Sequence, residues 1–340
     1  MAGNWGVRVV LPAGDIPDLY AFDPLTLSKQ LASLKTPVWV MLNLSEGGYG
    51  GRYTSTNQYI KSKISEKMVP SRDLLKETIE LLTNEGFKIL IYYASDGPRG
   101  NILFRRNEKR KNKRNLTNES TIKDNWDSYL LENNLTNHLA IGEILKQYSV
   151  KFGNTIDGWW FDHAQFGDSG LFVNSVREGN EDTFIAWNEK HKYFRVREDV
   201  TKKFVNLWGL RKSMLNETYT AGHITNTEII DPWSNENYKL IEQIENGKNN
   251  GISLVDGIQA HIFLPIQKTW RGGRANFPTN IALDWTLKTT QSCGAITWAI
   301  ALKHPEFSYS RLAKKQLQQL QHIDSKLIAA GYRTRDHIHD

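Results

Sequence analysis

The stretch "SRDLLKETIELLTNEGFKILIYYAS", residues 71–95, shows the pattern that decides the fold of this chain. Its first part, up to Gly86, has the amphipathic pattern of a helix. Ser71 is the predicted cap at the start of this helix, because serine often caps helices, and Gly86 ends it, because glycine often follows a helix. The segment 88–95 has an uninterrupted run of aliphatic and aromatic residues at 89–94, which is typical of a strand buried on both faces of a parallel sheet. The stretch therefore predicts a helix followed by a buried strand.

The same alternation recurs along the chain. Further strands are predicted at 5–12, 37–45, 156–163, 218–225, 256–265 and 294–302. Further helices are predicted at 24–34, 136–153, 198–215, 278–294 and 308–331. We expect an α/β fold of the (β/α)₈ TIM-like barrel type, as a single catalytic domain over residues 1–340 with insertions near 97–125 and 165–197. The competing doubly wound sheet lacks support because no Gly-rich phosphate fingerprint follows the first strand.

Composition limits the function classes. The 340 residues are 39% hydrophobic, and no run reaches the length of a membrane span. The single cysteine, Cys293, excludes an internal disulfide framework and a cysteine-based zinc site. The histidines show no metal-ligand spacing such as HExxH, so no metal and no cofactor is predicted.

The net charge is +6, and seven Lys or Arg residues fall within 105–114. A solvated loop, a nucleic-acid patch and a groove wall for a sulfated or carboxylated polymer all fit this charge. The basic run has no interleaved aromatic residues for base stacking, which argues against nucleic acid.

A second stretch, "IDGWWFDHAQFG", residues 156–167, places an acid at the end of an aromatic strand. A charge there is costly unless it has a use. In a barrel, catalytic residues gather at the carboxyl ends of the strands. Besides Asp162, the predicted strand ends carry further polar or aromatic side chains, namely Asn43, Glu46, Asp96, His163, His223, His261 and Trp298.

Several of these segments resemble the α-L-fucosidases of glycoside hydrolase family 29. Their first helix and second strand are similar to the segment "FDPLTLSKQLASLKTPVWVMLNLSEGGYGGRYTS". Their next helix and strand are similar to "RDLLKETIELLTNEGFKILIYYAS", which has the same pair of tyrosines, including Tyr93. "IGEILKQYSVKFGNTIDGWWFDHA" is similar to the segment that carries their nucleophile. By this resemblance, Asp162 is the nucleophile of a retaining α-L-fucosidase-like enzyme.

The departures shift the expected substrate. The His-His pair and the usual acidic Glu of those fucosidases are missing, as is the β-sandwich that follows their barrel. A histidine acid/base beside an Asp nucleophile resembles the family 107 endo-fucanases, which cut sulfated fucans internally. The resemblance therefore implies His261 as the acid/base, with His223, Glu228 and Asp231 in reserve and with His163 able to orient Asp162.

The chemistry is consistent with those roles. A retaining glycosidase needs an ionised nucleophile and a proton donor, and a histidine titrates near neutral pH. Aromatic rings stack on sugars, and guanidinium groups bind sulfate. The expected substrate-binding residues are Asn43, Tyr49, Arg52, Tyr93, Trp160, His163, His223, Trp270, Arg271, Arg274 and Trp298.

The expected partner is an anionic, sulfated polysaccharide, with no membrane. The residues "MAGNWGVRVVLPAG" lack the features of a signal peptide, and the expected substrate nevertheless favours a secreted or periplasmic location. Three alternatives stay open: an exo-acting α-L-fucosidase, a non-catalytic glycan-binding barrel and a nucleic-acid binder.

Overall fold

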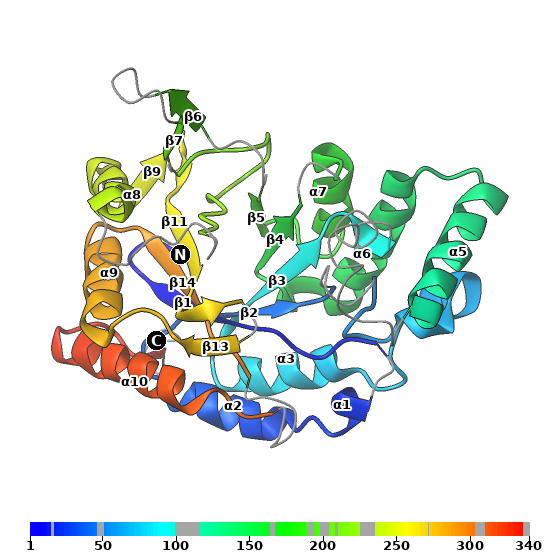
Figure 1. Ribbon diagram of the computed structural model, residues 1–340, viewed down its shortest axis with the longest axis horizontal. Coiled ribbons are helices and arrows are strands. Elements are labelled where there is room, and N and C mark those ends of the chain that lie inside the picture. Colours follow the sequence, from blue (N-terminus) through cyan, green and yellow to red (C-terminus); the bar gives the residue numbers. More distant parts are fainter. Residues whose placement is uncertain are drawn as a thin grey trace.

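The computed structural model describes residues 1–14, 17–45, 51–98, 116–163, 167–188, 194–197, 204–207, 210–224, 235–270, 272–302 and 310–335. Their centre is a parallel seven-stranded sheet in the order β11-β14-β1-β2-β3-β4-β5 (Figure 1). The strands are β1 (Trp5–Val9), β2 (Trp39–Asn43), β3 (Lys88–Ala94), β4 (Gly158–Asp162), β5 (Phe184–Trp187), β11 (His261–Pro265) and β14 (Ala295–Ala299).

The sheet curls until one segment reaches both of its edges. In residues 218–224, the Thr218 amide donates to the Ile185 carbonyl of β5. The Ile224 amide donates to the Phe263 carbonyl of β11, and His223 forms a parallel bridge with Phe263. The α/β fold is therefore a curled parallel sheet of the kind that a TIM-like barrel contains.

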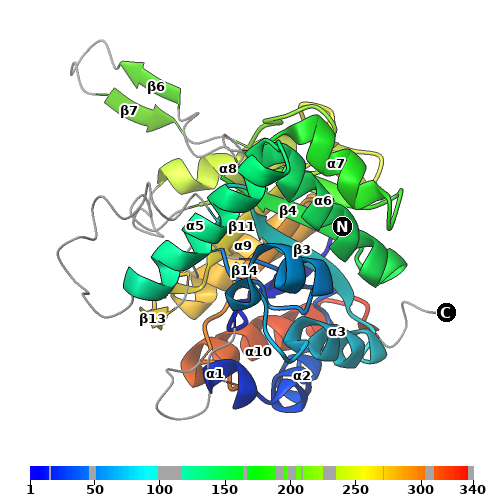
Figure 2. The ribbon, with the colours of Figure 1, turned by 90° about the vertical axis from the view of Figure 1, so that its right-hand side faces the viewer.

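Helices cover the outer face of the sheet (Figures 1 and 2). They are α1 (Pro17–Tyr20), α2 (Pro24–Ala32), α3 (Leu74–Asn84), α5 (Leu116–Glu132), α6 (Asn137–Phe152), α7 (Ser169–Arg177), α8 (Asn235–Asn246), α9 (Thr279–Gln291) and α10 (Lys314–Ala329). No helix in these described ranges is long and apolar enough to cross a membrane.

Short elements lie between the main ones. A π-helix η2 (Ile60–Ile64) and 3₁₀ turns η3 (Glu66–Met68) and η4 (Gly153–Thr155) precede α3 and β4. The small strands are β6 (Phe194–Arg197), β7 (Phe204–Leu207), β8 (Lys248–Asn249), β9 (Ile252–Val255), β10 (Ile258–Gln259), β12 (Gln267–Thr269) and β13 (Gly272–Ala275). Figure 2 shows the β6–β7 hairpin projecting from the rest of the molecule.

Side chains alternate between two cores, as the period of a strand requires. One set of strand residues packs under the helices, and the other packs inside the curl of the sheet. On β3, for example, Ile91 and Tyr93 belong to the helix layer, whereas Tyr92 belongs to the interior. The alternation determines which residues of each strand can reach the site.

Three local features differ from the expected pattern. The cap of α3 is Asp73, whose carboxylate accepts from the Lys76 amide, rather than Ser71. The supposed insertion at 165–197 contains α7 and the sheet strand β5. The predicted helix at 198–215 contains strand β7, which pairs with β6, and its Phe204 and Val205 are residue types that favour strands.

Candidate active site

Asp162 is the last residue of β4 and lies at the carboxyl end of the sheet. It is 5% exposed. Tyr92 Oη donates to its Oδ2 over 2.5 Å, and Asn188 Nδ2 donates to its Oδ1 over 2.7 Å. The His163 amide also donates to Oδ1, over 2.9 Å. These donors suit an ionised carboxylate and hold it in one orientation.

His163 packs its ring between two acids. Its Nε2 lies 3.3 Å from Asp162 Oδ2, and its Nδ1 lies 2.9 Å from Asp96 Oδ2. Its φ of 55° is in the left-handed region, which costs a non-glycine residue free energy. A strained backbone that presents an imidazole to a buried carboxylate is typical of a functional site.

His223 occupies the segment between β5 and β11, at the level of Phe263. Its half-buried ring stacks on Trp270, with centroids 4.7 Å apart and planes at 12°. It also meets Trp160 at 5.5 Å, and Trp160 stacks on Tyr92 at 5.3 Å. A wall of aromatic rings thus joins His223 to the tyrosine that binds Asp162.

Arg8 is a site residue that the sequence analysis missed. It is 2% exposed, and its neighbours Val7 and Val9 belong to the helix layer, so its own side chain faces the interior of the curl. Its guanidinium carbon lies 4.9 Å from the Tyr92 ring centroid and 5.8 Å from that of Trp270. A charged residue inside an otherwise apolar strand, "WGVRV", is the signal that could have found it.

The structure does not bring His261 to this site. His261 opens β11, so its ring lies about 6–7 Å closer to the amino end of the sheet than the level of Phe263. It is fully buried, and burial lowers its pKa to about 4. Its Nδ1 lies 3.0 Å from the Thr220 carbonyl oxygen, which can only accept, and its Nε2 lies 2.8 Å from Thr297 Oγ1. The structure therefore places His261 below the site, as a buried ring with partners at both nitrogens.

Three predicted sugar contacts have structural roles instead. Asn43 uses both ends of its amide on the Leu11 backbone. Tyr93 faces the helix layer, where its hydroxyl lies 3.3 Å from that of Tyr53. Trp298 also faces the helices, and its Nε1 donates to Thr286. All three side chains are buried, and the structure does not bring them to the Asp162 site.

The remaining predicted residues fall into two groups. Trp160 is fully buried and Trp270 is half-buried, whereas Arg52 lies on the loop after β2 and Arg274 lies on the short strand β13. The other predicted residues, which lie outside the described ranges, are Tyr49, Arg271, Glu228 and Asp231.

Within the described ranges, no cluster of three or more His, Cys, Asp or Glu side chains could hold a metal ion.

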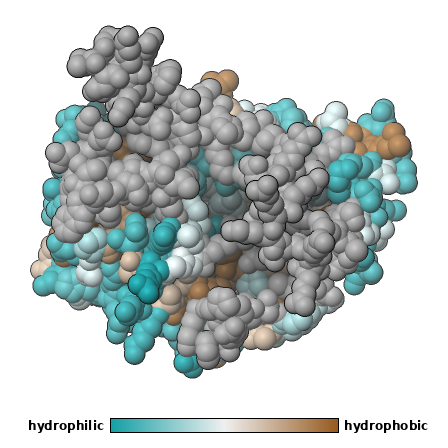
Figure 3. Space-filling model, in the orientation of Figure 1, coloured by the Kyte–Doolittle hydropathy of each residue, from teal (hydrophilic) through white to brown (hydrophobic). Residues whose placement is uncertain are grey.

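Figure 3 shows mostly hydrophilic side chains on the described surface of one face, with only small hydrophobic areas. The aromatic residues of the site belong instead to the cluster inside the curl of the sheet.

Comparisons with known proteins point to one family. A family model described as "Endo-alpha(1,4)-fucoidanase Mef1" matches residues 1–335. No curated protein sequence matches the chain.

Several solved structures share the fold. An endo-fucoidan hydrolase from glycoside hydrolase family 107 superposes with a TM-score of 0.80 at 19% identity, over 98% of this chain and 93% of that chain. A second one gives a TM-score of 0.74 at 18% identity, over 96% of this chain and 53% of that chain. An α-L-fucosidase from Paenibacillus thiaminolyticus gives 0.55 at 12% identity, over 97% and 74% of the two chains.

Proposed function

The chain belongs to the endo-α(1,4)-fucoidanase family Mef1, and we propose that it hydrolyses α(1,4)-fucosidic bonds inside fucoidan by a retaining mechanism. It is a glycosidase of the fucoidan-degrading type. In this proposal, residues 218–224 serve as the remaining strand of a closed (β/α)₈ barrel, and the whole chain forms one catalytic domain. A large extracellular polysaccharide as substrate implies secretion of the enzyme.

The observation that carries the proposal is the Asp162 carboxylate, held by Tyr92 and Asn188 at the carboxyl end of the sheet. Asp162 attacks the anomeric carbon, the leaving oxygen takes a proton, and a covalent fucosyl–enzyme forms. Water then displaces the enzyme carboxylate in a second inversion, which restores the α configuration.

His223 is the proton donor in this mechanism. It is half-buried, its ring stacks on Trp270, and it contacts Trp160, which in turn stacks on the tyrosine bonded to Asp162. An imidazole has an unperturbed pKa near 6.5, so it can give a proton to the leaving oxygen and take one from the incoming water at neutral pH. Negative sulfate groups nearby favour its protonated form.

His163 and Asp96 position the nucleophile. The ring of His163 bridges the two carboxylates, so a change in Asp96 acts on Asp162 through it. Arg8 positions Tyr92 and Trp270 from below and adds a buried positive charge that attracts the anionic substrate. Trp270, Arg271, Arg274 and Tyr49 contribute to the sugar subsites.

The experiment is depolymerisation of fucoidan by the wild type and by Asp162→Asn, followed on oligosaccharide gels. Asp162→Asn should fall below about one thousandth of the wild-type rate, because the nucleophile cannot be replaced by an amide. Asp182→Asn, an exposed acid between α7 and β5, is the matched control and should cut normally.

Three outcomes would contradict the proposal. A wild-type rate in Asp162→Asn would remove the nucleophile. Release of fucose alone would show exo action, and binding of fucoidan by the wild type without any cleavage would show a non-catalytic barrel.

A further inference from the structure

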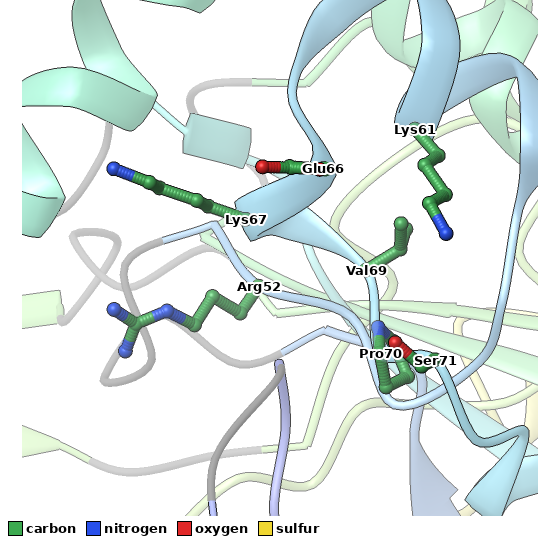
Figure 4. Close-up of a pocket in the computed structure, with 7 residues that line it drawn as sticks. All are labelled: Arg52, Lys61, Glu66, Lys67, Val69, Pro70 and Ser71. Carbon is green, nitrogen blue, oxygen red and sulfur yellow. The ribbon is translucent and has the colours of Figure 1, made fainter.

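A polar pocket lies in the segment between β2 and α3, apart from the residues that surround Asp162. Its volume is about 340 Å³, and it is lined by Arg52, Lys61, Glu66, Lys67, Val69, Pro70 and Ser71. Figure 4 shows Arg52 and Lys67 extending to one side, while Lys61 lies beyond Val69 on the other. At neutral pH, three cations and one carboxylate therefore surround the pocket.

The backbone under the pocket is firmly held. Ile60 and Met68 are fully buried, so Lys61 and Lys67 beside them project outward from a fixed base. The Tyr53 amide donates to the Met68 carbonyl over 2.8 Å, which joins the loop that carries Arg52 to η3. Lys61 belongs to a π-helix, an uncommon element that often occurs at functional sites.

The stem of Arg52 is also fixed. It crosses Gly14 so closely that a Cβ at position 14 would lie 2.3 Å from Arg52 Cδ. Gly14 has a φ of +78°, which also favours glycine, and its amide donates to the Tyr53 carbonyl. The stem of Arg52 is thus held in the loops that follow β1 and β2, at the same end of the sheet as Asp162 on β4.

We propose that this pocket binds one sulfated sugar of the polysaccharide, distant from the bond that is cut. The inference rests on the proposed function and extends it to a remote subsite. Arg52 and Lys67, which extend to the same side, match a sulfate group, and Lys61 adds positive charge on the other side of the pocket. Glu66 and Ser71 accept hydrogen bonds from sugar hydroxyls, and Val69 and Pro70 offer an apolar floor to the methyl group of a 6-deoxy sugar.

The test measures binding of sulfated fucan oligosaccharides of increasing length to Asp162→Asn protein, which keeps them intact. Adding Lys61→Gln and Lys67→Gln should weaken binding of long oligosaccharides about three- to tenfold, since two partly exposed ion pairs are lost. The loss should grow with oligosaccharide length and shrink as salt is raised. The matched control is Lys29→Gln with Lys326→Gln, two exposed lysines on α2 and α10.

Equal affinity of the Lys61/Lys67 variant and the control for every length would overturn the subsite. An equal loss for sulfated and desulfated oligosaccharides would also overturn it, because the cations would then not bind sulfate. Binding is measured without turnover, so this test of the subsite is independent of the cleavage assay. If the wild type failed to cut fucoidan, the proposed function would be refuted. The binding comparison would still decide whether the subsite exists.

Discussion

Tyr92 on β3 donates a 2.5 Å hydrogen bond to Oδ2 of Asp162 on β4, the neighbouring strand of the sheet. The two side chains face the interior from adjacent strands. The Arg8 guanidinium also lies over the ring of Tyr92, in a cation–π contact. The bond both aims the carboxylate and stabilises its negative charge.

Tyr92→Phe should lower kcat about 10- to 100-fold, because a hydrogen bond to a charged group contributes roughly 1.5–3 kcal/mol. KM should change little, since the hydroxyl contacts the nucleophile and not the sugar. Steady-state kinetics on fucoidan measure both constants, and Tyr93→Phe, whose hydroxyl faces the helix layer, is the control. An unchanged kcat in Tyr92→Phe would show that the bond has no catalytic role.

Replacing each of the two histidines separates their roles. His223→Gln should lose at least about a hundredfold in kcat, the usual contribution of general acid catalysis, and should lose the alkaline limb of the pH–rate profile. His261→Gln should keep kcat within about threefold at temperatures where it is folded, because its ring lies one layer below the site. The opposite result, a dead His261→Gln and an active His223→Gln, would return the acid role to His261.

His261 also predicts how stability depends on pH. Burial lowers its pKa to about 4, while the unfolded chain titrates it near 6.5. Between these values the imidazole is protonated in the unfolded chain and neutral in the folded chain. The free energy of unfolding therefore falls as the pH drops from 6.5 to 4. The loss amounts to roughly 3 kcal/mol.

Denaturant unfolding of the wild type and His261→Gln across this pH range measures the effect. The variant should show a flatter dependence on pH, whatever its absolute stability. Parallel curves for the two proteins would contradict a buried neutral imidazole at position 261.

The sequence could predict the strands that carry most of the site, because long apolar runs such as 88–95 and 158–162 have few other solutions. It missed β5, since "FIAW" is a short run among polar residues. With β5 it missed Asn188, which binds Asp162 from the residue after that strand.

The ends of strands were harder to predict than their presence. The pattern at 256–265 suggested one long strand with His261 in its second half, whereas β11 begins at His261 after a separate strand, β10. A shift of a few residues thus moved a histidine from one end of the sheet to the other. Likewise, the pair of tyrosines at 92–93 does not reveal which of them faces the interior, because that depends on the register of the neighbouring strands.

The central claim, direct attack by Asp162, is tested most directly by the anomeric configuration of the new reducing end. Proton NMR in the first minutes of fucoidan hydrolysis detects the anomer before mutarotation mixes the two forms. Two successive inversions at the anomeric carbon should give the α product first. An initial β product would mean a single displacement by water, with Asp162 as a base, and would contradict the covalent intermediate.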